Sequence, residues 1–223
     1  GTKSVPAVRG FVRAAFRFLI EKQRADAVVV ACNTATSVAV DEMRRLYEVP
    51  IIGMEPAVKK ALERDAERRV LVTATPITIN GEKLHRLVSA HDTKGLVDLL
   101  ALPRLVEFAE HREFASPRVE AYLWDALSPY DLRKYSALVL GCTHFNYFKD
   151  TLRRLLPKTM GFVDGNGGTV EEWARRTGLT TVPAGTQTAQ CSFFESGRPV
   201  AGAESLARIE SYLARAARME KIV

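Results

Sequence analysis

Short, continuously apolar runs alternate with longer stretches of helical periodicity along this chain, and no other feature limits the fold as strongly. Such an order is typical of parallel α/β units, in which helices cover both faces of each strand. Strands are predicted at residues 27–31, 50–54, 69–74, 137–141 and 160–163. Helices are predicted at residues 6–23, 36–47, 56–66, 79–90, 103–112, 117–127, 146–156, 169–177 and 201–219. We therefore predict an α/β protein with parallel sheets.

Two segments of the chain repeat one pattern. AVVVACNTATSVAVDEMRRLY at residues 27–47 and ALVLGCTHFNYFKDTLRRLLP at residues 137–157 each read as a strand, a Cys, a polar pair, a helix and Arg-Arg-Leu. In a parallel α/β sheet, ligands bind at the carboxyl ends of the strands. The repeat therefore predicts two similar halves, each with one cysteine, Cys32 or Cys142, at its ligand-binding edge.

The surroundings of both cysteines favour chemistry on an anionic ligand. The unpaired N–H groups and the dipole at the start of the following helix shift a thiol toward thiolate and hold a carboxylate beside it. Polar groups follow each sulfur directly, from Asn33, Thr34, Thr143 and His144. The pattern indicates an anionic ligand bound between two bases.

Other roles for the cysteines explain less of this pattern. A single Cys that closes a valine-rich strand is usually buried and inert, but two in the same position of a repeat favour a chemical role. A cysteine protease would leave the second Cys unexplained. Redox exchange would fit a C-x-x-C spacing, which the sequence lacks. Cys191, in TAQCSFFE, has no polar company of this kind, and we predict a buried strand residue there.

Metal binding is also disfavoured. A metal site needs a richer ligand set than Cys142 and His144 supply. The remaining histidines lie on helical patterns, where exposure or a satisfied core position is the usual role, and these are His85, His91 and His111. We predict no metal.

Composition excludes further classes of partner. Three cysteines are too few for a disulfide scaffold and fit a reducing compartment. No apolar run approaches the ~20 residues needed to cross a bilayer, and the opening GTKSVPAVRG lacks the apolar core of a secretion signal. The formal charge of +6 could favour nucleic acid, but the arginine pairs lie in amphipathic helical stretches with acidic neighbours. We expect a soluble, cytoplasmic protein with neither a membrane nor a nucleic-acid partner.

Four motifs carry a resemblance to a known family. They are ACNTAT at 31–36, VPIIGMEPAVKKA at 49–61, GCTHF at 141–145 and GTKS at 1–4. With these segments the chain resembles the aspartate/glutamate racemase family, in which a segment similar to GTKS follows a Pro-Tyr pair. The resemblance runs over nearly the whole chain and is weakest at residues 91–135. It implies racemisation of glutamate without a cofactor, in which two cysteines act as bases on opposite faces of the substrate.

The resemblance also implies a role for each site residue. Cys32 acts on D-glutamate and Cys142 on L-glutamate, His144 assists Cys142, and Glu107 in PRLVEF is a supporting acid. The residues that match substrate-binding positions are Gly1, Asn33, Thr34, Thr75, Thr78, Thr143 and His144. The product, D-glutamate, would serve peptidoglycan synthesis in a bacterial cytoplasm, and a homodimer is the family's usual assembly.

By the same resemblance, the first domain comprises residues 1–55 and continues with residues 165–223. The second domain comprises residues 56–164, and the substrate lies between the two.

The chain departs from the family pattern in two places. Family members begin with a strand that carries an Asp-Ser pair, whose Asp assists the first cysteine, whereas this sequence starts at Gly1. Either the sequence omits these residues, or the first half-site is incomplete and the chain is an inactive binding module. In addition, DGNGG at 164–168 stands where a Ser-Ala-Glu-like sequence is expected after the Asp. A racemase of aspartate or another amino acid would share both cysteines, whereas a decarboxylating relative needs only one.

Overall fold

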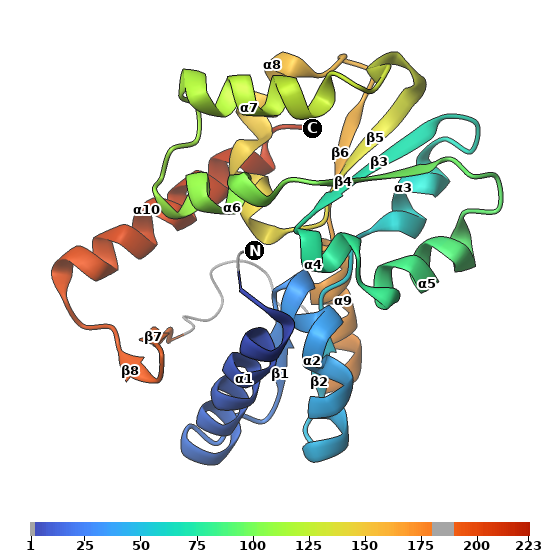
Figure 1. The fold of residues 1–223 in the computed structure, drawn as a ribbon. Coiled ribbons are helices and arrows are strands. Elements are labelled where there is room, and N and C mark those ends of the chain that lie inside the picture. Colours follow the sequence, from blue (N-terminus) through green and yellow to red (C-terminus); the bar gives the residue numbers. More distant parts are fainter. Residues whose placement is uncertain (1–2, 180–189) are drawn as a thin grey trace.

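The computed structural model describes residues 3–179 and 190–223. Its strands are β1 (Val28–Val30), β2 (Ile51–Gly53), β3 (Arg69–Ala74), β4 (Val97–Ala101), β5 (Tyr135–Leu140), β6 (Gly161–Val163), β7 (Phe194–Glu195) and β8 (Arg198–Pro199). β1 and β2 form one parallel sheet, and a second parallel sheet has the order β4-β3-β5-β6. The predicted α/β class with parallel sheets is thus confirmed, and Figure 1 shows the smaller sheet in the lower half of the molecule.

Helices follow the strands in the predicted order. They are α1 (Val5–Phe16), the π-helical turn η1 (Arg17–Lys22), α2 (Asn33–Leu46), α3 (Val58–Arg64), α4 (Pro76–Ile79), α5 (Glu82–His91), α6 (Pro103–Glu110), α7 (Pro117–Leu127), the 3-10 segments η2 (Leu132–Lys134) and η3 (Thr143–Phe148), α8 (Lys149–Leu155), α9 (Asn166–Thr177) and α10 (Ala203–Glu220). Every predicted strand and helix has a counterpart here. The sequence analysis missed β4 and the antiparallel β7–β8 hairpin.

The two central strands of the four-stranded sheet, β3 and β5, are largely apolar because both of their faces are covered. All six residues of β5 are buried. Along β3, Leu71 packs into one apolar cluster, with α6, α7 and α8, whereas Val70 and Val72 pack into another, with α3 and α5. Successive side chains of a strand point to opposite faces, so a strand covered on both sides has no polar face to show.

Two segments that connect the part with the smaller sheet to the part with the larger sheet lie against each other. One is the segment after β2, which contains Glu55, and the other is the segment between β6 and α9, which contains Gly165. A Cβ atom added at Gly165 would lie only 2.6 Å from the carbonyl oxygen of Glu55, so this close approach requires glycine. The DGNGG segment is therefore a strand-to-helix turn, and Lys149 reaches its first residue, Asp164, with a nitrogen–oxygen distance of 3.4 Å.

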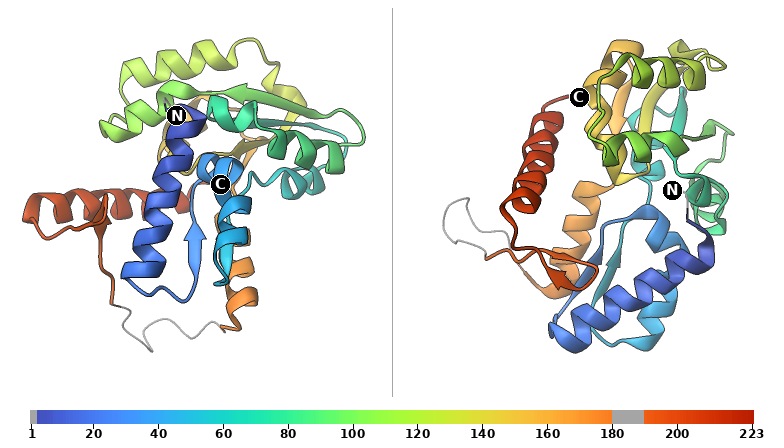
Figure 2. Two further views of the ribbon diagram at one scale, coloured as in Figure 1. Left: turned by 60° about the horizontal axis from the view of Figure 1, so that its bottom comes forward. Right: turned by 60° about the vertical axis from the view of Figure 1, so that its left-hand side comes forward.

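The last part of the chain contacts both halves of the molecule. The β7–β8 hairpin lies beside η1, where the rings of Phe194 and Phe18 have centroids 5.0 Å apart. α10 instead packs on the half that contains the larger sheet, against α6 and η3 (Figure 1 and the right-hand view of Figure 2). The proposed domain boundaries stay a prediction, but α10 makes its main contacts with the part assigned to residues 56–164.

The prediction for Cys191 was wrong. This residue was expected to be a buried strand residue, but it is exposed and precedes the β7–β8 hairpin without belonging to it. The apolar residues after it, Phe193 and Phe194, are themselves more than a third exposed. A short apolar run therefore did not signify burial here.

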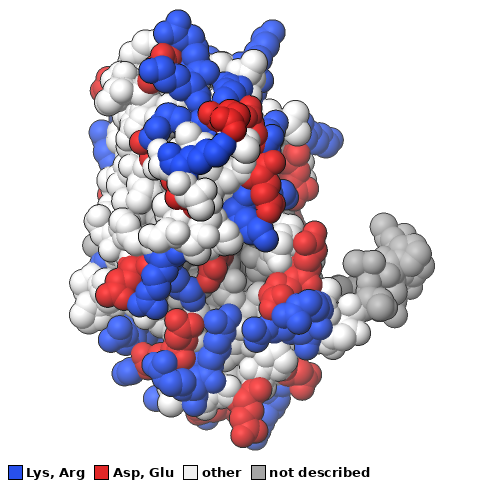
Figure 3. Space-filling view, turned by 90° about the vertical axis from the view of Figure 1, so that its right-hand side faces the viewer, with Lys and Arg blue, Asp and Glu red and all other residues white. Residues whose placement is uncertain are grey.

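Charged side chains are mixed on the surface. Figure 3 shows basic and acidic side chains side by side over one face of the molecule. Many belong to pairs within one helix, such as Arg175 and Arg176 with Glu172 on α9. This arrangement is typical of solvated helix faces. In the part of the chain that the structure describes, no helix is long and apolar enough to cross a membrane.

Candidate active site

Cys32 stands at the junction of β1 and α2. Its backbone is extended (φ −151°, ψ 115°), and its sulfur accepts the main-chain N–H of Ala35 at 3.5 Å, so the residue caps the helix. Because the first N–H groups of a helix have no partner within it, they favour an acceptor that carries negative charge. Cys32 is exposed, so a substrate can reach its thiol.

Cys142 holds the equivalent place between β5 and η3. Its backbone has nearly the same conformation (φ −142°, ψ 134°), but the residue is only 8% exposed. Burial is the main cause that raises the pKa of the Cys142 thiol to about 11; the main-chain N–H of His144 opposes the rise, and nearby Cys32 contributes to it. Each cysteine thus lies between the carboxyl end of a parallel strand and the start of a helical segment.

The imidazole of His144 lies next to the Cys142 thiol, and the carboxylate of Glu110 lies on the other side of that imidazole. The Nδ1 atom of His144 lies 3.9 Å from the Cys142 sulfur, and its Nε2 atom lies 2.8 Å from Oε1 of Glu110. When Nε2–H donates to the carboxylate, Nδ1 is left as an acceptor that faces the thiol. The arrangement thus places a ring nitrogen beside the thiol and a carboxylate on the other side of the ring.

The carboxylate in this group is not the one that the resemblance implied. Glu107 is exposed, and it is its main-chain carbonyl that accepts hydrogen bonds from the main chain and ring of His111. Glu110, three residues later on α6, reaches His144 instead. Both residues lie in the same short helix, and the sequence alone did not show which of its turns faces η3. The acid in FAEHRE was therefore missed.

Three buried hydroxyl groups join the two halves near the cysteines. Thr34 Oγ1 at the start of α2 lies 2.8 Å from Thr75 Oγ1 and 3.2 Å from Thr78 Oγ1, which belong to the start of α4. Thr75 and Thr78 are themselves 3.2 Å apart. Because a hydroxyl can rotate to donate or accept, this cluster can turn its donors toward a bound carboxylate.

Asn33 supplies an unpaired polar atom. Its side chain is buried, with 5% of the residue exposed, and no donor among the described residues reaches its Oδ1 atom. A buried acceptor without a partner costs free energy, which a ligand that carries N–H groups would recover. Thr143 opens η3 directly after Cys142 and is half-buried. Gly1, the remaining predicted binding residue, lies outside the described residues.

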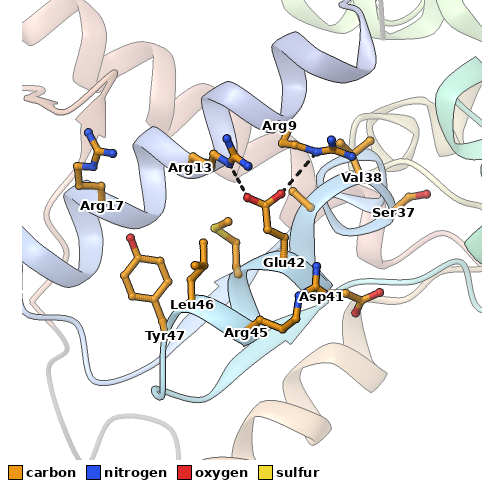
Figure 4. A pocket seen from close by; sticks show the side chains of 12 residues that line it. Arg9, Arg13, Arg17, Ser37, Val38, Asp41, Glu42, Arg45, Leu46 and Tyr47 are labelled. Atoms are coloured by element: carbon orange, nitrogen blue, oxygen red, sulfur yellow. Dashed lines mark hydrogen bonds and ion pairs between the residues drawn. The ribbon is translucent and has the colours of Figure 1, made fainter.

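A groove between α1 and α2 lies apart from this site. It has a volume of about 730 Å³ and is lined by residues of α1, η1 and α2 together with Tyr47, and neither cysteine contributes to it (Figure 4). Arg9 and Arg13 share the carboxylate of Glu42 there. Within residues 3–179 and 190–223, no three His, Cys, Asp or Glu side chains lie together as metal ligands.

The unequal burial of the cysteines gives a first prediction. At neutral pH, a thiol with a pKa of about 11 instead of 9.0 carries about one hundredth of the thiolate. We expect iodoacetamide to modify Cys32 and Cys191 well before Cys142, and the modification of Cys142 to accelerate as the pH rises from 9 toward 11. Peptide mass spectrometry of timed samples measures this, and equal rates in urea serve as the control. Fast modification of Cys142 at pH 7 would contradict its burial.

Comparisons with known proteins agree with this geometry. The family model described as Asp/Glu/Hydantoin racemase matches residues 1–172. A glutamate racemase of Campylobacter concisus (strain 13826) is 49% identical over 100% of this chain and 85% of its own length. Glutamate racemase 2 of Bacillus subtilis (strain 168) is 40% identical over 93% of this chain and 78% of its own length. The crystal structure of Escherichia coli glutamate racemase, in complex with L-glutamate and the activator UDP-MurNAc-Ala, matches with a TM-score of 0.75 at 26% identity, over 95% of this chain and 79% of that one.

Proposed function

Since the chain belongs to the Asp/Glu/Hydantoin racemase family, we propose that it interconverts L-glutamate and D-glutamate by a two-base mechanism in which Cys32 and Cys142 exchange the α-proton. The match confirms the family resemblance seen in the sequence. The curated glutamate racemases of Campylobacter concisus and Bacillus subtilis align with 100% and 93% of the chain, which supports an isomerase that acts on glutamate. The observation that carries the mechanism is one thiol at the carboxyl end of a strand in each half.

The proton has a complete route in this mechanism. The Cys142 thiolate removes the α-proton from L-glutamate and becomes a thiol, which leaves a planar carbanion. The Cys32 thiol then gives its proton to the opposite face, which yields D-glutamate and the Cys32 thiolate. The reverse reaction uses the same steps in the opposite order, and no group other than the two thiols needs to change its protonation overall.

The carbanion is the difficult species, and the remaining site residues act on it. An ionised carboxylate beside the α-carbon stabilises a carbanion poorly, so hydrogen bonds to that carboxylate and exclusion of water must lower the barrier. Thr34, Thr75 and Thr78 provide hydroxyl donors, and Thr143 provides another beside Cys142. The Asn33 oxygen accepts from the substrate ammonium. His144 and Glu110 keep the Cys142 thiolate available by holding its proton.

The proposal extends to the cofactor, the pathway, the assembly and the domains. The reaction needs no cofactor, because two bases and the hydrogen bonds supply the chemistry. D-glutamate would serve peptidoglycan synthesis in the cytoplasm, and the chain would work as a homodimer. The substrate would lie between the domains formed by residues 1–55 with 165–223 and by residues 56–164. A racemase of aspartate remains the alternative within the family, and a binding module without catalysis is the alternative outside it.

Exchange of the α-proton distinguishes these functions. In D2O, an active enzyme must replace the α-proton of L-glutamate with deuterium while the circular dichroism of the solution decays. We expect the α-proton signal in the NMR spectrum and the circular dichroism to decay together when both are measured on one sample. The same experiment with L-aspartate tests the alternative substrate. Exchange on aspartate alone would change the substrate assignment. No exchange on either, from folded protein with reduced thiols, would leave a binding module.

A further inference from the structure

The C-terminal helix α10 contacts both elements that carry the group behind Cys142. The hydroxyl of Tyr212 donates to the carbonyl oxygen of Ala109 at 2.9 Å and lies 3.3 Å from that of Glu110. These are the last two residues of α6, and the Ala109 oxygen also accepts the main-chain N–H of Arg112 at 2.9 Å. Tyr212 therefore fixes the main chain of the residue whose carboxylate holds His144.

Arg215, three residues along α10, anchors the helix to the other element. Its guanidinium donates to the carbonyl oxygen of Tyr147 in η3 at 2.7 and 3.0 Å and to both carboxylate oxygens of Asp150 at 2.7 and 2.9 Å. It also stacks over the ring of Phe114, 4.4 Å from the centroid. The Arg215 side chain is only 11% exposed, and its Nη2 atom alone lies within hydrogen-bond distance of both Asp150 oxygens and of the Tyr147 carbonyl. These charge-assisted hydrogen bonds hold α10 against η3 and the start of α8.

Aromatic rings complete the connection to the site. The Tyr147 ring packs edge-on to the His144 ring, with centroids 6.5 Å apart, and against the Tyr212 ring, with centroids 5.4 Å apart. α10 thus contacts the chain at Glu110 and the ring that flanks His144. Residues far away in the sequence therefore pack beside both the imidazole and the main chain that carries the carboxylate.

We propose that Tyr212 is a positioning residue for proton transfer at Cys142: its hydroxyl holds the end of α6 so that Glu110 keeps Nδ1 of His144 aimed at the thiol. This inference rests on the proposed function. It assigns to α10 a catalytic effect on one of the two proton transfers, and no direct contact with the substrate.

Tyr212→Phe tests the proposal, because it removes only the hydroxyl. We expect kcat to fall by about tenfold, since a small misplacement of a catalytic group costs one to two orders of magnitude in rate. Tyr122→Phe is the matched control. That tyrosine is also half-buried and also packs on α6, against Phe108, but its hydroxyl lies at the main chain of Arg104 near the start of α6 and not at the carbonyls of the helix end. The control should keep the wild-type rate.

Isotope effects separate positioning from a general loss of active protein. When transfer at Cys142 becomes the slow step, L-glutamate deuterated at the α-carbon should show a larger kinetic isotope effect on kcat/KM in Tyr212→Phe than in the wild type. The effect on deuterated D-glutamate should shrink, because its label moves in the faster step at Cys32. Partial unfolding would lower both rates and leave both isotope effects unchanged.

A double variant ties the effect to Glu110. In the Glu110→Gln background, adding Tyr212→Phe should cost less than about twofold more, because residues that act through one group are not additive. Additive losses, unchanged isotope effects or a wild-type rate in Tyr212→Phe would each overturn the positioning role. A wild-type protein that fails to exchange the α-proton would overturn the proposed function, and this role with it. If the wild type turns over normally, a negative result with Tyr212→Phe counts against the role of Tyr212 alone.

Discussion

Replacing either Cys32 or Cys142 by serine is expected to slow glutamate racemisation by about three orders of magnitude, within the range that a positioned acid or base contributes. A hydroxyl has nearly the size of a thiol but is a far weaker acid, so it cannot form the anion that removes the α-proton. Both proton transfers lie on one path, and therefore the loss of either base blocks both directions. Steady-state rates from L-glutamate and from D-glutamate measure the effect.

The fold should survive both substitutions. Serine is among the preferred residues at the start of a helix, so Ser in place of Cys32 keeps the cap on α2. At position 142 it keeps the shape of the turn into η3. Cys191→Ser is the matched control, since Cys191 is exposed and precedes the β7–β8 hairpin, and we expect it to retain the wild-type rate. Near-wild-type turnover in Cys32→Ser or Cys142→Ser would refute the two-base assignment.

The sequence predicted those parts of the molecule that local patterns determine. A strand buried on both faces is mostly apolar, and the apolar run at residues 137–140 therefore identified β5. The Cys at the end of each such strand could be placed at the carboxyl edge of a sheet, because connections in parallel α/β units put it there. The position of both thiols follows from the repeat alone.

Parts that depend on distant contacts could not be predicted in this way. β4 carries Asp98 in its middle, and that carboxylate pairs with Arg69 on β3 and accepts from the hydroxyl of Tyr135 on β5. A charged residue at this place breaks the apolar run, and its partners are far away in the sequence. α10 was expected as a helix, but its docking on α6 and η3 depends on Tyr212 and Arg215, whose partners no periodicity reveals.

Glu110→Gln is expected to lower kcat by about one hundredfold with little change in KM. The glutamine keeps the size of the side chain but removes the charge that stabilises a protonated His144. Its amide can also donate to Nε2. The ring proton would then lie on Nδ1, which faces the Cys142 thiol, and Nδ1 could no longer accept the thiol proton. An effect on kcat and kcat/KM alike, with KM preserved, indicates a contribution made in the transition state.

Glu107→Gln provides the comparison on the same helix. It removes the same charge three residues away; both glutamates are exposed, but it is the Glu110 carboxylate that bonds to His144. If the carboxylate acts through its hydrogen bond to His144, Glu107→Gln keeps the wild-type rate. If a general negative charge near η3 is all that matters, the two variants lose activity to a similar degree. A larger loss in Glu107→Gln would mean that Glu107, the acid that the family resemblance implied, supports Cys142 in solution, and that α6 is turned to present it.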